Sequence, residues 1–318
     1  MRISLENSCM PLMERAQDNP EVISVNNRTD LALESATGLS GAPEGVAIDR
    51  ESTGETEITW VRIRTQEASQ RIGKPCGNYW TLTRRDLPRL DPQTRMIVAQ
   101  QVADTLRMLL PKRGSVLVLG LGNRRMTADA LGPRTVDGVL VTRHMQDTKL
   151  RSVCALSPGV LGVTGIETAE LAESLTRQLK PDAVIVIDAL AAMETGHICT
   201  TIQVTDTGIR PGSGVGNHRA GINRETMSAP VIAIGIPMVV YASTIVRDTL
   251  ERLMSGEAPA EEAADAAEQL ARVAPEDMVV TPRDIDELVQ GLGDLLALSI
   301  NAALHPAMTM ESLSHYLH

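Results

Sequence analysis

Three short apolar runs without polar alternation stand out along the chain, and they indicate buried strands. They occupy residues 116–119 (VLVL), 182–190 (DAVIVIDAL) and 230–237 (PVIAIGIP). Parallel sheets use such strands because helices cover both of their faces. Two further segments, residues 58–64 and 77–83, have the mixed apolar and polar character of half-buried strands, which implies a mixed sheet.

Helical periodicity separates these runs. The segments with an apolar stripe at helical spacing are residues 91–110, 166–180, about 240–253 and about 281–304. Asp91 is placed to cap the first of them. Short strands are also expected at residues 138–142 and, at a sheet edge, at residues 200–204.

The alternation of strands and helices predicts an α/β fold, with a twisted, mostly parallel sheet flanked by helices. We expect a single α/β domain over residues 31–318, preceded by a loosely structured leader. The Ala- and Glu-rich residues 257–277 are interpreted as a solvated insertion in that domain.

Two aspartates follow the apolar runs at the end of the strands where open α/β sheets bind ligands. Asp129 comes after the first run and a glycine turn, and Asp188 lies at the end of the second. A right-handed crossover between neighbouring strands would bring both carboxylates to one crevice. A carboxylate pair that shares a proton can activate water and protonate a leaving group, which is hydrolase chemistry. The alternative is that either aspartate caps a helix or stabilises a turn.

Two other chemistries are considered for this crevice. The LGLGN turn is similar to a dinucleotide fingerprint, but Arg125 stands where the third glycine belongs, so a nucleotide-dependent oxidoreductase rests on an incomplete motif. A metal-dependent peptidase would need paired ligands, and His144, His197 and His218 form no HExxH or comparable pair. The four cysteines show no CxxC spacing. We therefore expect neither a cofactor nor a metal.

Glycine-rich segments after the strands are expected to line the crevice, because long glycine-rich loops within compact domains are usually functional or disordered. The residues expected to supply backbone or polar lining are Gly122, Asn123, Gly162, Thr164, Gly165, Asp206 and Gly214. Backbone N–H groups in these segments could stabilise an oxyanion.

Composition narrows the class of protein. The formal net charge is −10, and the 318 residues include two Trp, three Tyr and no Phe. This chain offers neither the basic face nor the stacked rings of a nucleic-acid-binding protein. No apolar run approaches the roughly 18 residues of a membrane span, and acidic residues interrupt the N-terminal stretch that a signal peptide would need. We therefore expect a cytoplasmic protein without membrane or direct nucleic-acid partners.

Several longer motifs, in order along the chain, are similar to those of a known family. They are LGLGN and T-x-DALGP within residues 119–133, PGVLGVTGIET at 158–168, VIDALA at 186–191 and TIQVTDTGIRPGSGVGN at 201–217, with TPRDID and ALHP near the C-terminus. Together they resemble the germination protease of endospore-forming bacteria. The basic residues at 124–125 and the 257–277 insertion depart from the usual family pattern.

The resemblance implies an endopeptidase that degrades small acid-soluble spore proteins during germination, in the cytoplasm of the forespore or spore core. It implies an atypical acid peptidase whose core is related in fold to the hydrogenase-maturation proteases, with extra strands, and it implies a homotetramer. The family's two candidate catalytic aspartates fall on Asp129 and Asp188.

The resemblance also changes the interpretation of residues 28–34, which by composition are only a loop entering a strand or helix. Residues 28–32 (RTDLA) match the family's processing site. They imply a zymogen that removes its own propeptide, residues 1–30, by cutting between Asp30 and Leu31. Acidic, apolar and alanine residues follow one another here in the order that the family prefers.

Overall fold

The computed structural model describes residues 29–37, 44–145, 150–210, 220–254 and 278–314. The leader up to residue 28, Gly214, His218 and the expected insertion at 257–277 lie outside the described residues. The described chain is built on a nine-stranded sheet in the order β1-β2-β3-β7-β8-β6-β4-β5, with β9 paired to β8.

One half of the sheet is parallel and the other half is antiparallel. The parallel strands, from the edge inward, are β5 (Val153–Leu156), β4 (Val116–Gly120), β6 (Ala183–Ala192) and β8 (Val231–Tyr241). The antiparallel strands are β7 (Thr201–Thr205), β3 (Gly77–Thr83), β2 (Thr56–Ile63) and β1 (Val46–Thr53), with β9 (Val279–Val280) on the far part of β8. All five residues of β4 are buried, as its apolar run predicts.

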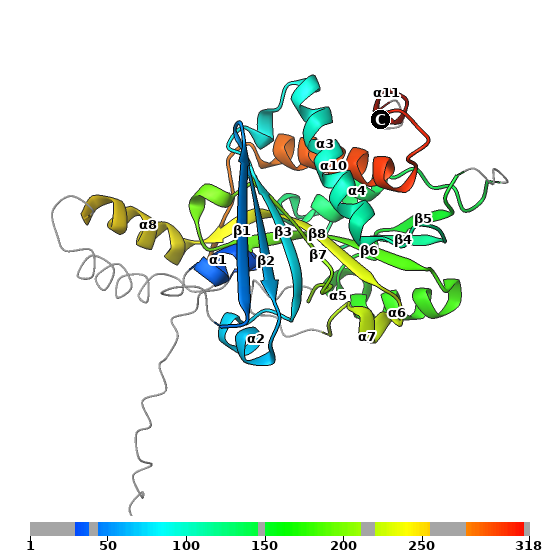
Figure 1. The fold of residues 1–318 in the computed structure, drawn as a ribbon, viewed down its shortest axis with the longest axis horizontal. Helices are drawn as coiled ribbons and strands as arrows, with labels where there is room; N and C mark the ends of the chain where they lie inside the picture. The colour runs from blue at the N-terminus through cyan, green and yellow to red at the C-terminus, as the bar shows by residue number, and fades with distance from the viewer. Residues whose placement is uncertain (1–28, 38–43, 146–149, 211–219, 255–277, 315–318) are drawn as a thin grey trace, which may run out of the picture.

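Helices cover both faces of the sheet (Figure 1). The helices α3 (Pro92–Leu109), α4 (Leu131–Asp137) and α10 (Ile285–Leu304) pack on one face, and α6 (Thr168–Leu179) and α7 (Arg224–Met227) pack on the other. The remaining helices are α1 (Ala32–Thr37), α2 (Gln66–Ile72), α5 (Leu161–Thr164), α8 (Ala242–Met254), α11 (Met310–Ser314) and the short 3₁₀ turns η1 (Leu87–Arg89), η2 (Thr127–Asp129) and η3 (Thr195–His197). The expected α/β fold, a sheet flanked by helices, is confirmed. The sheet is mixed where a mostly parallel one was expected, since three of the eight strand pairings among the described residues are parallel.

The N-terminus of α3 shows why the sequence pattern succeeds there. Asp91 Oδ1 accepts hydrogen bonds from the backbone N–H groups of Gln93 and Thr94, at 3.0 and 3.1 Å. Pro92 occupies the first helical position, where a missing N–H costs nothing. The helix therefore begins at the residue that the capping signal indicates.

Two predicted strands differ from the structure. Residues 138–142 form no strand: the Leu140 N–H donates to Asn301 Oδ1 on α10, at 2.8 Å, and the edge strand is β5 instead. The strand predicted at 200–204 exists as β7, but it lies between β3 and β8 and is not an edge. Both differences arise from long-range partners that local periodicity does not contain.

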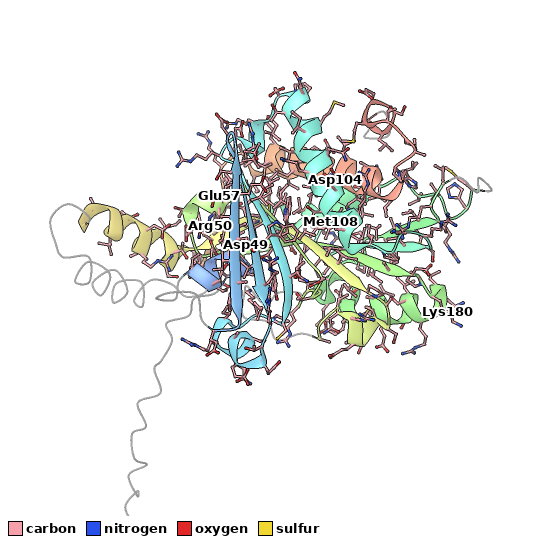
Figure 2. All side chains as sticks on the ribbon, viewed as in Figure 1. Asp49, Arg50, Glu57, Asp104, Met108 and Lys180 are labelled. Atoms are coloured by element: carbon pink, nitrogen blue, oxygen red, sulfur yellow. The ribbon has the colours of Figure 1, made fainter. Side chains whose placement is uncertain are left out.

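The outer edge of the antiparallel half is β1. Its residues Asp49 and Arg50 are exposed, and Glu57 lies on the adjacent strand β2 (Figure 2). Charged side chains on an edge strand hinder pairing with a second sheet. Within the described residues, no helix is both long and apolar enough to span a bilayer.

Candidate active site

The turn after β4 holds the carboxylate of Asp129. The Asn123 backbone N–H donates to Asp129 Oδ2 at 2.8 Å. Gly122 makes this possible: its φ is 110°, and a Cβ added there would lie 2.0 Å from the Asp129 carbonyl oxygen. Glycine alone adopts this conformation readily and leaves room for that contact. The turn thus wraps around Asp129, the last residue of η2.

Asp188 lies inside the neighbouring strand β6, one residue beyond the last residue that pairs with β4. The prediction that Asp188 ends its strand is wrong, because pairing with β8 continues β6 to Ala192. Asp188 is 7% exposed, and its Oδ1 accepts a hydrogen bond from the Ala189 N–H at 2.9 Å. One residue earlier, the Ile187 carbonyl accepts a hydrogen bond from the Leu121 N–H at 2.8 Å, which joins the end of β4 to β6. The turn η2, which ends in Asp129, contacts both β6 and β8. The two aspartates therefore belong to adjoining segments at the carboxyl edge of the parallel strands.

Gly132 fixes how closely α4 approaches these strand ends. A Cβ added at Gly132 would lie 2.3 Å from the Leu121 carbonyl oxygen and 2.6 Å from the Ile187 carbonyl oxygen. The first turn of α4 therefore packs directly on the backbone that precedes Asp188. Because Asp129 comes just before α4, this contact sets the position of one aspartate relative to the other.

A row of residues crosses the sheet at the level of Asp188. Asp188 on β6 is opposite Gly235 on β8, and Gly235 is opposite Gln203 on β7. Residues directly opposite each other point to the same face of a sheet, so Asp188 and Gln203 share a face. Their Cα atoms are two strand spacings apart, roughly 10 Å. Leu190 covers the gap over Gly235, because a Cβ there would lie 2.5 Å from Leu190 Cγ.

The segment around Asp30 and Leu31 lies on this same face. The Asp30 N–H donates to the Ala191 carbonyl at 2.9 Å, and Asp30 Oδ2 accepts from the Ala191 N–H at 2.9 Å. Gln203 Nε2 donates to the Asp30 carbonyl at 3.1 Å, and Gln203 Oε1 accepts from the Ala32 N–H at 2.7 Å. The Asp30–Leu31 peptide is thus held between β6 and β7.

The side chain of Leu31 is completely buried. It belongs to an apolar cluster with Leu190, Ala192 and Val240. Full burial of a leucine side chain contributes about 1.5–3 kcal/mol, so this apolar contact anchors the segment more strongly than one neutral hydrogen bond. The bond between Asp30 and Leu31 therefore has a defined place in the fold.

Glu34 in α1 is a buried acid that joins this segment to the turn after β6. Its carboxylate accepts hydrogen bonds from the backbone N–H groups of Met193 and Glu194, at 2.7 and 2.9 Å, and from Thr29 Oγ1. His197 Nδ1 lies 2.7 Å from Glu34 Oε1. Burial lowers the pKa of His197, but the hydrogen bond and charge of Glu34 outweigh burial and raise it overall.

Glu34, Glu194 and His197 could also offer ligands to a cation, since one ligand atom from each lies within 4.8 Å of the others. The hydrogen bonds to Glu34 already use its carboxylate oxygens, so the group fits a buried ion pair and a segment anchor. His144, by contrast, is exposed and lies near the edge strand β5.

The other residues expected to line the crevice lie in several places. Gly162, Thr164 and Gly165 are exposed in and after α5, where Thr164 Oγ1 donates to the Val160 carbonyl at 3.1 Å. The glycine-rich segment after β5 therefore contains a short helix. Asp206 is exposed and accepts hydrogen bonds from the backbone and side chain of Asn78, at 2.8 and 2.6 Å. It connects the ends of β3 and β7.

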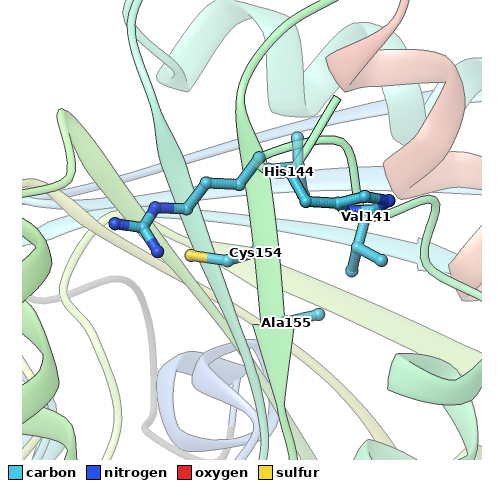
Figure 3. Close-up of a pocket in the computed structure, with 6 residues that line it drawn as sticks. Val141, His144, Cys154 and Ala155 are labelled. Carbon is cyan, nitrogen blue, oxygen red and sulfur yellow. The ribbon is translucent and has the colours of Figure 1, made fainter. Parts of the chain in front are cut away.

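A shallow pocket of about 410 Å³ lies against β5 (Figure 3). Its lining residues are Val141, Arg143, His144, Val153, Cys154 and Ala155. None of these six residues is a carboxylate, so the pocket offers no acid pair. The candidate hydrolytic site is therefore the strand-end region of Asp129 and Asp188, which the pocket does not include.

Gln203 and Glu34 are contributors that the sequence analysis missed. The sequence signal for Gln203 is a single amide side chain among the β-branched residues of TIQVT. In the structure, Gln203 lies on the opposite face of the sheet from Ile202 and Val204, which pack under α3 and α10. Glu34 stands four residues after Asp30 and has no local signal of burial.

A family model described as Germination protease matches residues 26–275. The chain belongs to the germination protease family. A germination protease from Caldanaerobacter subterraneus subsp. tengcongensis is 40% identical and covers 93% of this chain and 100% of its own length. A second, from Clostridium perfringens strain SM101, is 37% identical, over 92% of this chain and 99% of its own length. A third, from a Geobacillus species, is 35% identical, over 93% of this chain and 94% of its own length.

Among solved structures, the chain is similar to the hydrogenase maturation protease HycI from Thermococcus kodakarensis KOD1. The identity is 17% and the TM-score 0.31, over 53% of this chain and 97% of the other. The sequence match to the germination protease family confirms the resemblance inferred from the motifs. Membership of this family supports the interpretation of the chain as a peptidase. It favours that interpretation over the alternative of a nucleotide-dependent oxidoreductase.

Proposed function

We propose that this member of the germination protease family is a self-processing endopeptidase. It cuts its own chain between Asp30 and Leu31, removes residues 1–30 as a propeptide, and then initiates the degradation of small acid-soluble spore proteins during germination. The observation that carries the proposal is the position of the Asp30–Leu31 peptide, which lies on the sheet face that also carries Asp188.

Asp129 and Asp188 are assigned the chemical roles. One carboxylate accepts a proton from water as the water oxygen adds to the carbonyl carbon, and the other carboxyl group donates a proton to the leaving nitrogen. Two acids on adjoining segments suit this division, since like charges held close favour a state in which one proton is shared.

The test of this assignment is the intact mass of the purified full chain over time at mildly acidic pH. The native chain should lose residues 1–30, while Asp129→Asn and Asp188→Asn should slow the loss by about 10²–10⁴-fold, the usual contribution of general acid–base catalysis. Asp104→Asn is the matched control, because Asp104 is an exposed acid on α3.

Two outcomes would contradict the aspartate pair. If all four chains are clipped alike, a contaminating protease or another group is responsible. If a chelator stops the cleavage in the native chain and added metal restores it, the metal-dependent peptidase is favoured.

The substrate assignment follows from the family and has its own test. The processed chain should cleave a small acid-soluble spore protein at an acidic residue followed by an apolar residue and alanine, the pattern at Asp30, Leu31 and Ala32. Peptide mapping of the products identifies the bond. Cleavage at unrelated sequences with equal rates would contradict the preference.

The assembly and location are proposed on the same basis. We place the protein in the cytoplasm of the forespore and spore core, as a homotetramer without membrane or direct nucleic-acid partners. Sedimentation equilibrium of the purified chain tests the assembly, because a tetramer has four times the 34.2 kDa mass of one chain. A monomer at micromolar concentration would contradict it.

A further inference from the structure

Gln203 is a polar residue in an otherwise apolar stretch of sheet, and its contacts explain its presence. It is 5% exposed, and it lies on β7 between Ile202 and Val204, which are completely buried. Its carboxamide uses both ends on one short segment: Nε2 donates to the Asp30 carbonyl, and Oε1 accepts from the Ala32 N–H. One hydrogen bond therefore reaches the carbonyl of the Asp30–Leu31 peptide itself, and the other reaches the N–H of the next peptide, so the carboxamide spans Leu31.

Two further hydrogen bonds fix the same segment. The Thr29 carbonyl accepts a hydrogen bond from Lys74 Nζ at 2.6 Å, and Thr29 Oγ1 accepts from the Leu31 N–H at 3.0 Å. Burial lowers the pKa of Lys74, while the charges of Asp30 and Glu34 oppose that shift. With the Ala191 contacts and the buried Leu31 side chain, these contacts leave the peptide little freedom to rotate.

We infer that Gln203 positions the scissile peptide of self-processing and donates a hydrogen bond to its carbonyl oxygen. The inference rests on the proposed cleavage between Asp30 and Leu31. When water adds to the Asp30 carbonyl carbon, a C–O bond forms and negative charge develops on the carbonyl oxygen. Nε2–H is already directed at that oxygen. The C–N bond to Leu31 then breaks. One carboxyl group of the aspartate pair donates a proton to the leaving nitrogen, and the other carboxylate holds the proton lost by water.

The position of Gln203 relative to Asp188 supports this role. Both residues are opposite Gly235 and share its face, so the carbonyl that Gln203 binds lies on the side of the sheet from which Asp188 can act. Prepositioned donors at a developing oxyanion stabilise the transition state more than the ground state, because the charge appears only during reaction. Gln203 thus contributes to the rate of cleavage as well as to the docking of the segment.

Two substitutions separate the effect of the Gln203 hydrogen-bond donor from the effect of side-chain packing. Gln203→Met keeps a similar length without hydrogen bonds and should slow the loss of residues 1–30 by about 10²–10³-fold, as for removal of an oxyanion donor. Gln203→Glu keeps an acceptor for the Ala32 N–H but loses the donor while its carboxyl group is ionised. Protonation of the glutamate restores an O–H donor. The ratio of the native processing rate to the Gln203→Glu rate should therefore decrease as the pH falls.

The control is Thr81→Val. Thr81 is opposite Gln203 on β3 and is completely buried, and valine has a similar volume. This variant should process at the native rate. Thermal unfolding and near-UV circular dichroism of every chain establish that it is folded. If Thr81→Val slows processing as much as Gln203→Met, disturbance of the sheet explains the loss and the inference is wrong.

The remaining outcomes separate this inference from the proposed function. If the native chain processes at Asp30–Leu31 but folded Gln203→Met does so at the same rate, Gln203 has no such role and the proposed function stands. A Gln203→Glu deficit that stays constant over pH 4–7 would overturn the donor role. If the native chain never cuts at this bond, self-processing itself fails, and the role of Gln203 in it fails too.

Discussion

Gly132→Ala tests how tightly the position of Asp129 depends on backbone packing. The added Cβ would lie 2.3 Å from the Leu121 carbonyl oxygen, whereas real Cβ contacts essentially never fall below 3.0 Å. The first turn of α4 must therefore move by about 0.7 Å or more, away from the backbone that leads to Asp188. The atoms that resist are the backbone carbonyls of Leu121, just after β4, and of Ile187 in β6, which cannot turn aside as a flexible side chain can.

The expected magnitude follows from that displacement. Forcing a methyl group into close-packed structure costs about 1–3 kcal/mol, and a misplacement near 1 Å at reacting groups can slow catalysis by about 10²-fold. We therefore expect Gly132→Ala to fold with a melting temperature lower by about 2–8 °C. Its loss of residues 1–30 should be slower by between about 10- and 100-fold.

The assay pairs intact-mass kinetics with thermal unfolding. The matched control is Gly162→Ala, because a Cβ added at Gly162 meets nothing within 4 Å. Alanine also retains the backbone N–H of Gly162, so this variant should match the native chain in both measurements. If Gly132→Ala processes and unfolds like the native chain, the contact between α4 and the strand ends does not set the position of Asp129, and the reasoning is refuted.

Two other predictions concern buried titratable groups. In a cleavage-deficient chain, His197→Gln should lower the free energy of unfolding by about 1–3 kcal/mol below pH 6.5, where protonated His197 pairs with Glu34. Because the folded pKa is raised, this difference should shrink as the pH rises through that pKa; a constant difference in urea unfolding would contradict it. In a Cys9→Ser chain, a thiol reagent should label exposed Cys76 first and Cys199, whose pKa burial raises to about 12, only on unfolding. Rapid labelling of Cys199 in the folded chain would contradict the second prediction.

The strands and helices with strong local signals were predictable. β4, β6 and β8 are buried on both faces, so their sequences are almost entirely apolar, and α3 begins at its capping aspartate. β1 was missed because its sequence VAIDREST is largely exposed and polar. Its position is decided by pairing with β2, and local sequence patterns do not contain that pairing.

In the candidate site, too, some features were predictable from the sequence and others only from the structure. Expected strand-end placement pointed to Asp129 and Asp188, because the carboxyl ends of parallel strands meet at one edge. Asp129 does follow β4, whereas Asp188 lies inside β6, which pairing with β8 extends to Ala192. Asp206 follows a strand in the same way, yet it is bonded to Asn78. The antiparallel direction of β7 takes Asp206 toward the opposite end of the sheet from Asp188, and only the pairing of β7 with β8 reveals this.

The sequence by itself determined the family, the apolar strands, the two candidate aspartates and the RTDLA segment, because each depends on neighbours in the chain. The tertiary structure decided that this segment lies across the sheet, with the Gln203 carboxamide bonded to the Asp30 carbonyl and to the Ala32 N–H. Those partners are more than 170 residues apart in sequence, at separations of 171 and 173. Contacts of that kind depend on strand order and register, which local propensity does not encode.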